Sequence, residues 1–311
     1  MKKLISILIP CFNEEDVIDE TFRQVKDFIN NRSAYSFECI FIDDGSTDRT
    51  YSKLSDLVVT EKRIFKIIKL SRNFGHQLAL TAGLDYASGD AVVIIDADLQ
   101  DPFDIIDKMI EKWNLGFEVI SGKRVKREGE TKFKKVTASV FYKLLNFFSE
   151  IPIPLDTGDF RLIDKKVLFS LKEMPERNRF LRGMISWIGF KQTIVEYERK
   201  ERFAGKTKYP FIKMFKFALD GIISFSSKPL IISFIIGIIF SIIALILSIY
   251  TLYLRIFTDQ WITGWAALMI SILFFGGVQL ISIGVLSLYV GRILDQVKSR
   301  PMYIVENIIN D

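Results

Sequence analysis

The chain has 311 residues, of which 49% are hydrophobic, and carries a formal net charge of +5 at pH 7. A single histidine and two cysteines give no support for a zinc site built from a His/Cys cluster. Nucleic acid is a poor candidate partner, because the basic residues gather ahead of long apolar stretches.

The first part of the chain alternates apolar, β-branched runs with segments of helical periodicity. The runs at 4–9, 37–42, 65–70 and 91–95 end at turn-forming or acidic residues, as buried parallel strands do. Helices are predicted between them over 14–29, 50–59 and 76–87. This succession predicts an α/β fold with an open sheet of parallel strands covered by helices.

Ligands of such a sheet bind at the carboxyl ends of its parallel strands. The loops that matter begin at Pro10, Asp43, Ser71 and Asp96. Asp96 and Asp98 follow an apolar strand with one residue between them. Paired carboxylates in this place suit Mg²⁺ or Mn²⁺ held against a diphosphate, and the alternative is an ordinary surface turn.

Two further loops carry groups suited to a nucleotide. Asp43 and Asp44 offer carboxylates that accept hydrogen bonds from a ribose or a base edge. The alternative for the element at 43–48 is a helix N-cap, and both roles are compatible. The element at 10–15 offers the ring of Phe12 for a base and then places acids in the first turn of a helix.

The chain becomes more basic after the fourth strand. A fifth strand is predicted over 118–121, followed by a basic loop at 123–135, a helix over 136–148 and a loop at 152–161 that enters a short strand. The basic segments at 123–135 and 199–216 suit anionic lipid or a phosphate-bearing substrate, or are merely a solvated surface. His76 is more typical of a local hydrogen-bonding or capping residue than of a catalyst.

Two long apolar stretches without ionisable side chains lie near the end of the chain. Each exceeds the roughly 20 residues needed to cross a bilayer, which predicts a transmembrane hairpin with spans near 229–254 and 264–290. The alternative, a pair of buried core helices, is disfavoured by this length. An amphipathic helix at the membrane surface is predicted over 209–228, with a core-packed helix as the alternative.

The distribution of charge around the two stretches predicts their orientation. Basic residues flank the pair on its outer sides, so the positive-inside rule places both termini and a catalytic domain over 1–208 in the cytoplasm. The segment 229–311 then comprises the hairpin and a short cytoplasmic tail. The first apolar run is too short for a signal peptide, and Cys11 and Cys39 are expected to be free thiols.

Seven ordered motifs across nearly the whole chain resemble those of one enzyme family. The matching stretches are 10–15, 43–48, 71–76, 96–102, 157–162, 174–179 and 202–209. With the two apolar stretches that follow, the chain resembles the family 2 glycosyltransferases of the GT-A fold. The resemblance implies an α/β fold with a Rossmann-like, mixed, mostly parallel sheet and helices on both faces. Within that family it is most similar to the polyprenyl-phosphate branch, which contains bactoprenol glucosyltransferases and dolichol-phosphate mannose synthases.

The resemblance implies roles for particular residues. The implied nucleotide site comprises Pro10, Phe12, Glu14, Asp43, Asp44, Arg72 and Asp96. The implied metal ligands, for Mg²⁺ or Mn²⁺, are Asp96, Asp98 and Gln100. Asp159 and Asp98 are the implied catalytic residues, with Asp159 beside the sugar. The implied contacts to phosphate and acceptor are Arg124, Arg202, Lys206 and Thr207.

The implied reaction is inverting transfer of a hexose from a nucleotide sugar to undecaprenyl or another polyprenyl phosphate. It would take place at the cytoplasmic face of a bacterial inner membrane and supply cell-envelope glycosylation. The motifs favour UDP-glucose as donor, with N-acetylglucosamine, galactose or mannose donors as alternatives. Similar enzymes with such anchors assemble as homo-oligomers, including tetramers.

Other classes of protein fit the chain less well. A processive synthase is disfavoured, because two spans are too few for a polymer channel. A nucleotidyltransferase would show a glycine-rich triphosphate loop, and the element at 10–15 contains no glycine. A scaffold or lipid translocation component is the alternative outside enzymes, but the apolar stretches contain no charged pathway.

Overall fold

The computed structural model describes residues 2–59, 61, 64–125, 157–198, 223, 226–257 and 264–310. Their contacts divide them into two units. The first contains the described residues up to 198 together with 300–310, and the second contains those from 223 to 299. The helix predicted over 136–148 and most of the amphipathic helix predicted over 209–228 lie outside the described residues.

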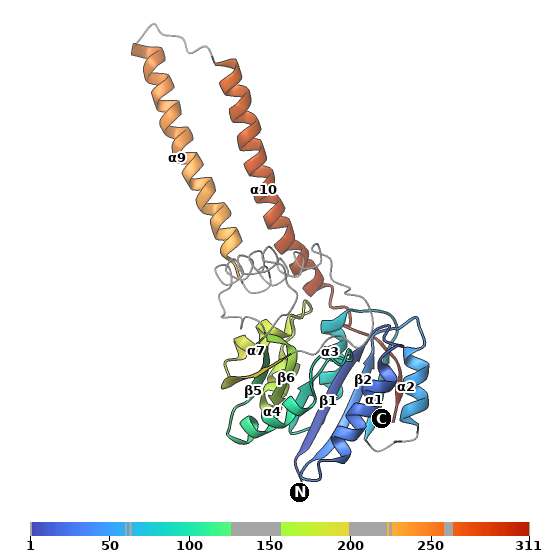
Figure 1. The fold of residues 1–311 in the computed structure, drawn as a ribbon. Coiled ribbons are helices and arrows are strands. Elements are labelled where there is room, and N and C mark those ends of the chain that lie inside the picture. Colours follow the sequence, from blue (N-terminus) through green and yellow to red (C-terminus); the bar gives the residue numbers. More distant parts are fainter. Residues whose placement is uncertain are drawn as a thin grey trace. The chain divides into compact units, whose positions relative to one another are not determined.

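An eight-stranded sheet forms the centre of the first unit, in the order β7-β5-β6-β4-β1-β2-β3-β8 (Figure 1). The strands are β1 (Leu4–Cys11), β2 (Ser36–Asp43), β3 (Phe65–Leu70), β4 (Ala91–Ile94), β5 (Val119–Arg124), β6 (Thr157–Asp164), β7 (Gln192–Tyr197) and β8 (Val305–Ile309). Strands β6 and β8 run antiparallel to their neighbours, and the other pairings are parallel. The predicted mixed, mostly parallel sheet is thereby confirmed.

Helices cover both faces of this sheet, as predicted. On one face, α1 (Ile18–Asn30) and α2 (Thr50–Val58) bury their apolar sides against alternate residues of β1, β2 and β3, and α4 (Asp104–Asn114) packs against β5, β6 and β7. On the other face lie α3 (His76–Tyr86) and α6 (Lys165–Glu173). Gly83 of α3 lies so close to the side chains of Ile42 and Leu8 that a methyl group there would meet both. The short helix α7 (Leu181–Ile188) packs against α6.

The last strand of the sheet comes from the end of the chain. Strand β8 pairs with the edge strand β3, with Ile67 opposite Ile309 and Ile68 opposite Ile308. Just before β8, the Ser71 N–H donates to the carbonyl of Ile304 at 2.9 Å. The sequence patterns indicated only a short tail here, whereas the structure incorporates it into the sheet.

The second unit is built on two long apolar helices, α9 (Lys228–Phe257) and α10 (Trp265–Val297) (Figure 1). Segments of 27 and 30 residues within them are long and apolar enough to cross a membrane. The helices touch through Phe240, whose ring lies edge-on to those of Phe274 and Phe275 at 5.5 Å. Most of their other large apolar side chains are exposed, which in water would be costly.

Candidate active site

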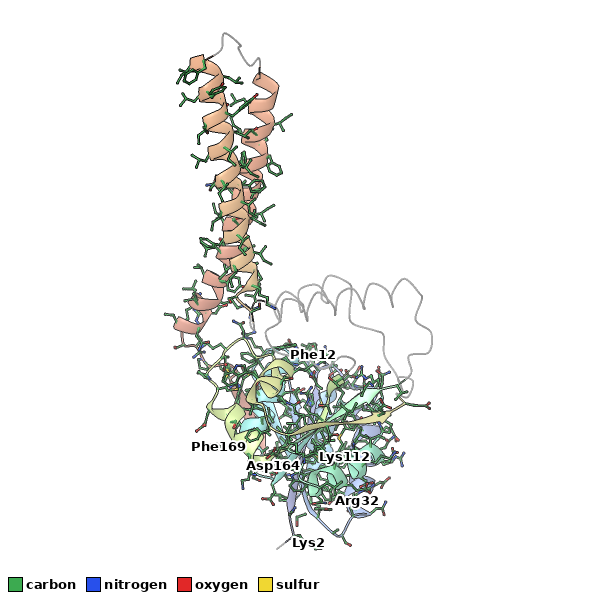
Figure 2. All side chains as sticks on the ribbon, turned by 90° about the vertical axis from the view of Figure 1, so that its left-hand side faces the viewer. Lys2, Phe12, Arg32, Lys112, Asp164 and Phe169 are labelled. Atoms are coloured by element: carbon green, nitrogen blue, oxygen red, sulfur yellow. The ribbon has the colours of Figure 1, made fainter. Side chains whose placement is uncertain are left out.

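The parallel strands end at one edge of the sheet, and the predicted loops gather there. Figure 2 labels Lys2 and Phe12, the residues that flank β1, at opposite ends of the first unit. Pro10 is buried near the end of β1, and the ring of Phe12 is half-buried just beyond it. The loops after β1, β2, β3 and β4 therefore surround the Phe12 end, where ligands of such sheets bind.

The loops after β1 and β2 are fastened to each other by hydrogen bonds. Asn13 adopts a left-handed backbone with φ of 52° and accepts the Thr47 N–H through its side chain at 2.8 Å. The Glu14 N–H donates to Thr50 Oγ1 at 2.8 Å. The carbonyl of Glu14 also receives the N–H of Ile18 at 3.0 Å, so this residue leads directly into α1.

The loop after β3 is held in turn by the loop after β2. Asp44 accepts the backbone N–H groups of Phe74 and Gly75, one on each carboxylate oxygen, at 2.7 and 2.9 Å. Gly45 has φ of +66°, and a Cβ there would lie 2.3 Å from the carbonyl carbon of Arg72. Asp44 thus has a structural role, because it holds the loop after β3. Its contact to a nucleotide stays a prediction.

Asp43 and Arg72 present different environments at the predicted nucleotide site. Asp43 is buried at the end of β2, and burial raises the pKa of its carboxyl group although the Ser46 N–H and hydroxyl oppose the shift. Arg72 is exposed, with its guanidinium 4.1 Å from the centre of the Phe74 ring. An exposed arginine beside an aromatic ring suits a phosphate or a base.

Asp96 and Asp98 lie directly after β4 in a tight turn. Leu99 has a left-handed φ of 58°, and the Gln100 N–H donates to Asp98 Oδ1 at 3.2 Å. Burial raises the pKa of Asp96 to about 6; the carboxylates of Asp101 and Asp98 add to this rise, and His76 opposes it. A bound cation would offset both the burial of this carboxyl group and the negative charge of its neighbours.

The donor set fits a hard cation held partly by a substrate. Among the described residues, no three His, Cys, Asp or Glu side chains form a group able to hold a metal ion. Asp96 and Asp98 instead offer two carboxylates, and Mg²⁺ commonly takes one or two carboxylates together with water and substrate phosphates. Gln100 stays a predicted ligand.

Asp159 reaches the same edge because β6 runs antiparallel to β4. Ile94 pairs with Arg161, so residues two positions beyond Ile94 and before Arg161 approach each other. His76 Nε2 lies between them, 3.8 Å from Asp96 Oδ1 and 3.2 Å from Asp159 Oδ2. The structure therefore brings together the two acids that the sequence placed in separate motifs.

Three side chains hold the carboxylate of Asp159. His76 and Gln77, at the start of α3, each lie 3.2 Å from Oδ2. Arg182, at the start of α7, donates through Nε to Oδ1 at 2.9 Å and through Nη2 to Oδ2 at 3.3 Å. Burial favours the neutral acid, but the charge of Arg182 and the hydrogen bond to His76 hold the pKa of Asp159 well below its usual range.

His76 takes a central place that its sequence context did not indicate. Burial alone would lower its pKa, yet the hydrogen bond with Asp159 and the charge of Asp96 raise the pKa of His76 to about 9. Gln77 and Arg182 were likewise absent from the predicted site. The one available signal was the proximity of Arg182 to the motif at 174–179, but only the fold shows that α7 begins beside β6.

Arg124 anchors another part of the same edge. Its Nε donates to the Tyr197 hydroxyl at 3.2 Å, and its Nη2 lies 3.9 Å from Asp101 Oδ1. The guanidinium also covers Gly158, where a Cβ would approach it to 2.8 Å. Arg124 is thus fixed near Asp159, while the predicted phosphate contacts Arg202, Lys206 and Thr207 lie outside the described residues.

Comparison with known proteins gives consistent matches. The uncharacterized glycosyltransferase YkcC of Bacillus subtilis (strain 168) is 50% identical over 301 residues, covering 97% of this chain and 93% of the relative. A prophage bactoprenol glucosyl transferase homolog of Escherichia coli (strain K12) is 43% identical over 304 residues, covering 98% of this chain and 99% of the relative. A solved structure, that of the mannosyltransferase PcManGT from Pyrobaculum calidifontis in complex with GDP-Man and Mn²⁺, is 18% identical with a TM-score of 0.44. The match covers 72% of this chain and 70% of the mannosyltransferase.

A family model of the glycosyl transferases gives the most direct assignment. The model named glycosyl transferase family 2 matches residues 6–170, which contain the sheet edge with Asp44, Asp96 and Asp159. The match spans more than half of the chain, and the relatives extend the similarity over nearly all of it. The chain therefore belongs to glycosyl transferase family 2.

Proposed function

We propose that this protein transfers a hexose from a nucleotide sugar to undecaprenyl phosphate or a similar polyprenyl phosphate, with inversion at the sugar. The observation that carries the proposal is the similarity, over nearly its full length, to a bactoprenol glucosyl transferase homolog. Two helices able to cross a membrane suit a lipid acceptor. UDP-glucose is the favoured donor, and UDP-N-acetylglucosamine, UDP-galactose and GDP-mannose are the alternatives.

The donor would lie along the loops at the carboxyl edge of the sheet. Phe12 offers a ring to the base, and Asp43 and Arg72 offer contacts to the ribose and phosphates. Asp96 and Asp98 would hold Mg²⁺ or Mn²⁺. When bound, such an ion offsets the charge that grows on the departing diphosphate.

Asp159 serves in this proposal to position the sugar rather than to remove a proton. A lipid phosphate is already largely ionised near neutral pH, because its second pKa is about 6. Both oxygens of Asp159 are engaged by His76, Gln77 and Arg182, and a carboxylate with a depressed pKa is a weak base. Arg124, Arg202 and Lys206 would neutralise the acceptor phosphate, and Thr207 would add a hydroxyl contact.

The site would work at the cytoplasmic face of a bacterial inner membrane. Strand β3 precedes α9 and strand β8 follows α10, and these two strands pair within the first unit, so the chain must leave and return on the same side of the membrane. Two spans, an even number, return the chain to the side from which it left. The basic residues outside the pair favour the cytoplasmic side.

The proposal is tested by a transfer assay on the full-length protein in detergent. The protein is incubated with Mg²⁺ or Mn²⁺, undecaprenyl phosphate and each radiolabelled nucleotide sugar, and the lipid is then extracted. We expect label in the lipid phase from one donor, its loss in Asp98→Ala and its loss when EDTA removes the metal. Asp104→Ala, which removes an exposed acid from the first turn of α4, is the matched control.

The result also identifies the sugar. Label that enters lipid from UDP-glucose alone supports the favoured donor, and label from another donor corrects it. Nucleotide binding without labelled lipid from any donor would overturn the polyprenyl-phosphate acceptor.

A further inference from the structure

Arg182 contributes to the site from outside the segment that the family model matches. The model covers residues 6–170, whereas Arg182 is the second residue of α7. Its side chain is largely buried, with 25% exposed, and its guanidinium forms a two-point contact with the carboxylate of Asp159. Two-point contacts of this kind fix the orientation of a carboxylate as well as its charge.

The start of α7 is itself fixed to the site by a second contact. Gln77 donates to Asp159 through Nε2 and accepts the N–H of Leu181 through Oε1 at 3.0 Å. One side chain of α3 thus joins the acid on β6 to the first residue of α7. This contact holds the start of α7, and with it the guanidinium of Arg182, beside Asp159.

Asp159 needs such a partner because its side chain is only 9% exposed. A buried carboxylate without a positively charged side chain beside it is costly, and it tends to move or to take up a proton. His76 approaches one oxygen, and Arg161 lies 3.7 Å from the other, but Arg161 also donates to the carbonyl of Gly158 at 2.8 Å. Arg182 alone of these residues contacts both oxygens within 3.3 Å.

We propose that Arg182 is a positioning residue for sugar transfer, which acts through Asp159 by holding its carboxylate in one orientation at the reacting sugar. This inference rests on the proposed function, in which Asp159 lies beside the sugar. Lysine would supply the charge but only a single point of contact. The geometry therefore predicts that charge alone is insufficient at this position.

The test is a double-mutant cycle on the full-length protein, with Arg182→Gln, Asp159→Asn and the double variant. Misplacement of the buried carboxylate should lower kcat about 100-fold in Arg182→Gln, with the donor KM within about threefold of wild type. Asp159→Asn should lower kcat about tenfold, and the double variant should match it, because no unpaired carboxylate remains. Arg182→Lys should lie between Arg182→Gln and wild type.

Lys166→Gln is the matched control, since it removes an exposed positive charge of the same unit that pairs with Glu118 at 3.7 Å. Its kcat should equal that of wild type. A double variant reduced by the product of the single losses, about 1,000-fold, would overturn the proposal, because Arg182 would then act independently of Asp159. An Arg182→Gln variant that changes KM alone would overturn it too.

Failure of the proposed function would look different. Wild-type protein would then transfer no sugar to polyprenyl phosphate, whatever the state of Arg182. Thermal unfolding of the same variants still measures the pair: the double variant should unfold at a higher temperature than Arg182→Gln. A double variant less stable than Arg182→Gln would overturn the coupling between the two residues.

Discussion

At the scale of single residues, Asp159 is an acid of the candidate site whose proposed role depends on both its charge and its geometry. Its carboxylate is buried and held by His76, Gln77 and Arg182. Such engagement keeps it ionised yet leaves little basicity for removing a proton. An acceptor that is already anionic has no need of a strong base.

The variant Asp159→Asn tests this interpretation by its pH dependence. A positioning role predicts a loss in kcat of about tenfold that high pH does not restore, whereas general base catalysis contributes about 100- to 10,000-fold. The measurement is the initial rate of lipid labelling between about pH 7 and 9, above the second pKa of the lipid phosphate, which is about 6. A loss of several orders of magnitude that high pH restores would contradict the positioning role.

Gly45 is the residue on which the approach of two site loops depends. With φ of +66° and the Arg72 backbone 2.3 Å from a Cβ, Gly45→Ala combines backbone strain with a clash. Gly116→Ala is the matched control, because Gly116 has φ of +88° and nothing within 4 Å. The control should lose about 1–2 kcal/mol of stability from strain alone.

Gly45→Ala should lose more stability than this control and should also bind the donor more weakly, because the Arg72 loop must move. Chemical denaturation gives the first quantity, and titration of the nucleotide gives the second. Equal stability losses in the two variants, with equal nucleotide affinity, would show that the close approach of the loops is unimportant.

At the scale of elements, the sequence predicted those parts of the fold that rest on local patterns. The apolar runs at 4–9, 37–42, 65–70 and 91–95 all became strands, because continuous β-branched runs suit a sheet buried on both faces. The positions of the site loops were predicted as well, because ligands of this fold class bind at the carboxyl ends of the parallel strands. Asp96 and Asp159 were singled out by motif, and their approach is explained by the pairing of Ile94 with Arg161.

The elements that escaped prediction depend on contacts between distant segments. Strand β8 has exposed and half-buried residues without clear alternation, and it becomes a strand by pairing with β3. His76 has no local signal for a central role, because its partners lie in the loop after β4 and in β6. Arg182 acquires its partner only through the packing of α7. Long-range pairing of this kind leaves no local period in the sequence.

Strand β8 also leads to a prediction about the loop after β3, which contains the proposed nucleotide contact Arg72. Besides the contact between Ser71 and Ile304, Tyr303 donates to Asp85 Oδ2 at 2.8 Å, so the tail is tied to both ends of the Ser71–Tyr86 segment. Truncation before Met302 should expose the edge of β3 and release this loop. We expect the unfolding temperature of the first unit to fall by about 5 °C or more and the donor KM to rise.

A synthetic peptide of residues 302–311 should partly restore donor binding to the truncated protein, because strand addition needs no covalent link. Glu306→Ala is the control: it removes the ion pair with Lys69 at 2.9 Å but leaves the strand pairing intact, and an exposed pair contributes little. Unchanged donor KM and unfolding temperature after truncation would contradict a role for β8.

At the scale of the whole molecule, one sheet contains residues from before and after the two apolar helices. Strand β3 precedes α9 and strand β8 follows α10, so the two outer ends of the helix pair must lie on the same side of any membrane they cross. The placement of both ends on one side does not depend on the distribution of charge. It leaves the positive-inside rule to decide only which side that is.

Cysteine labelling tests this topology against a low background. Cys11 and Cys39 are buried, and burial raises the pKa of both thiols, so native protein should react slowly with a maleimide. Asp259→Cys, between the two spans, should be labelled by a membrane-impermeant maleimide in cells with an intact inner membrane. Lys298→Cys, exposed at the end of α10, should be labelled only after permeabilisation. The reverse pattern would place the catalytic unit outside the cytoplasm, and equal labelling of both variants in intact cells would show that α9 and α10 do not span the membrane as a pair.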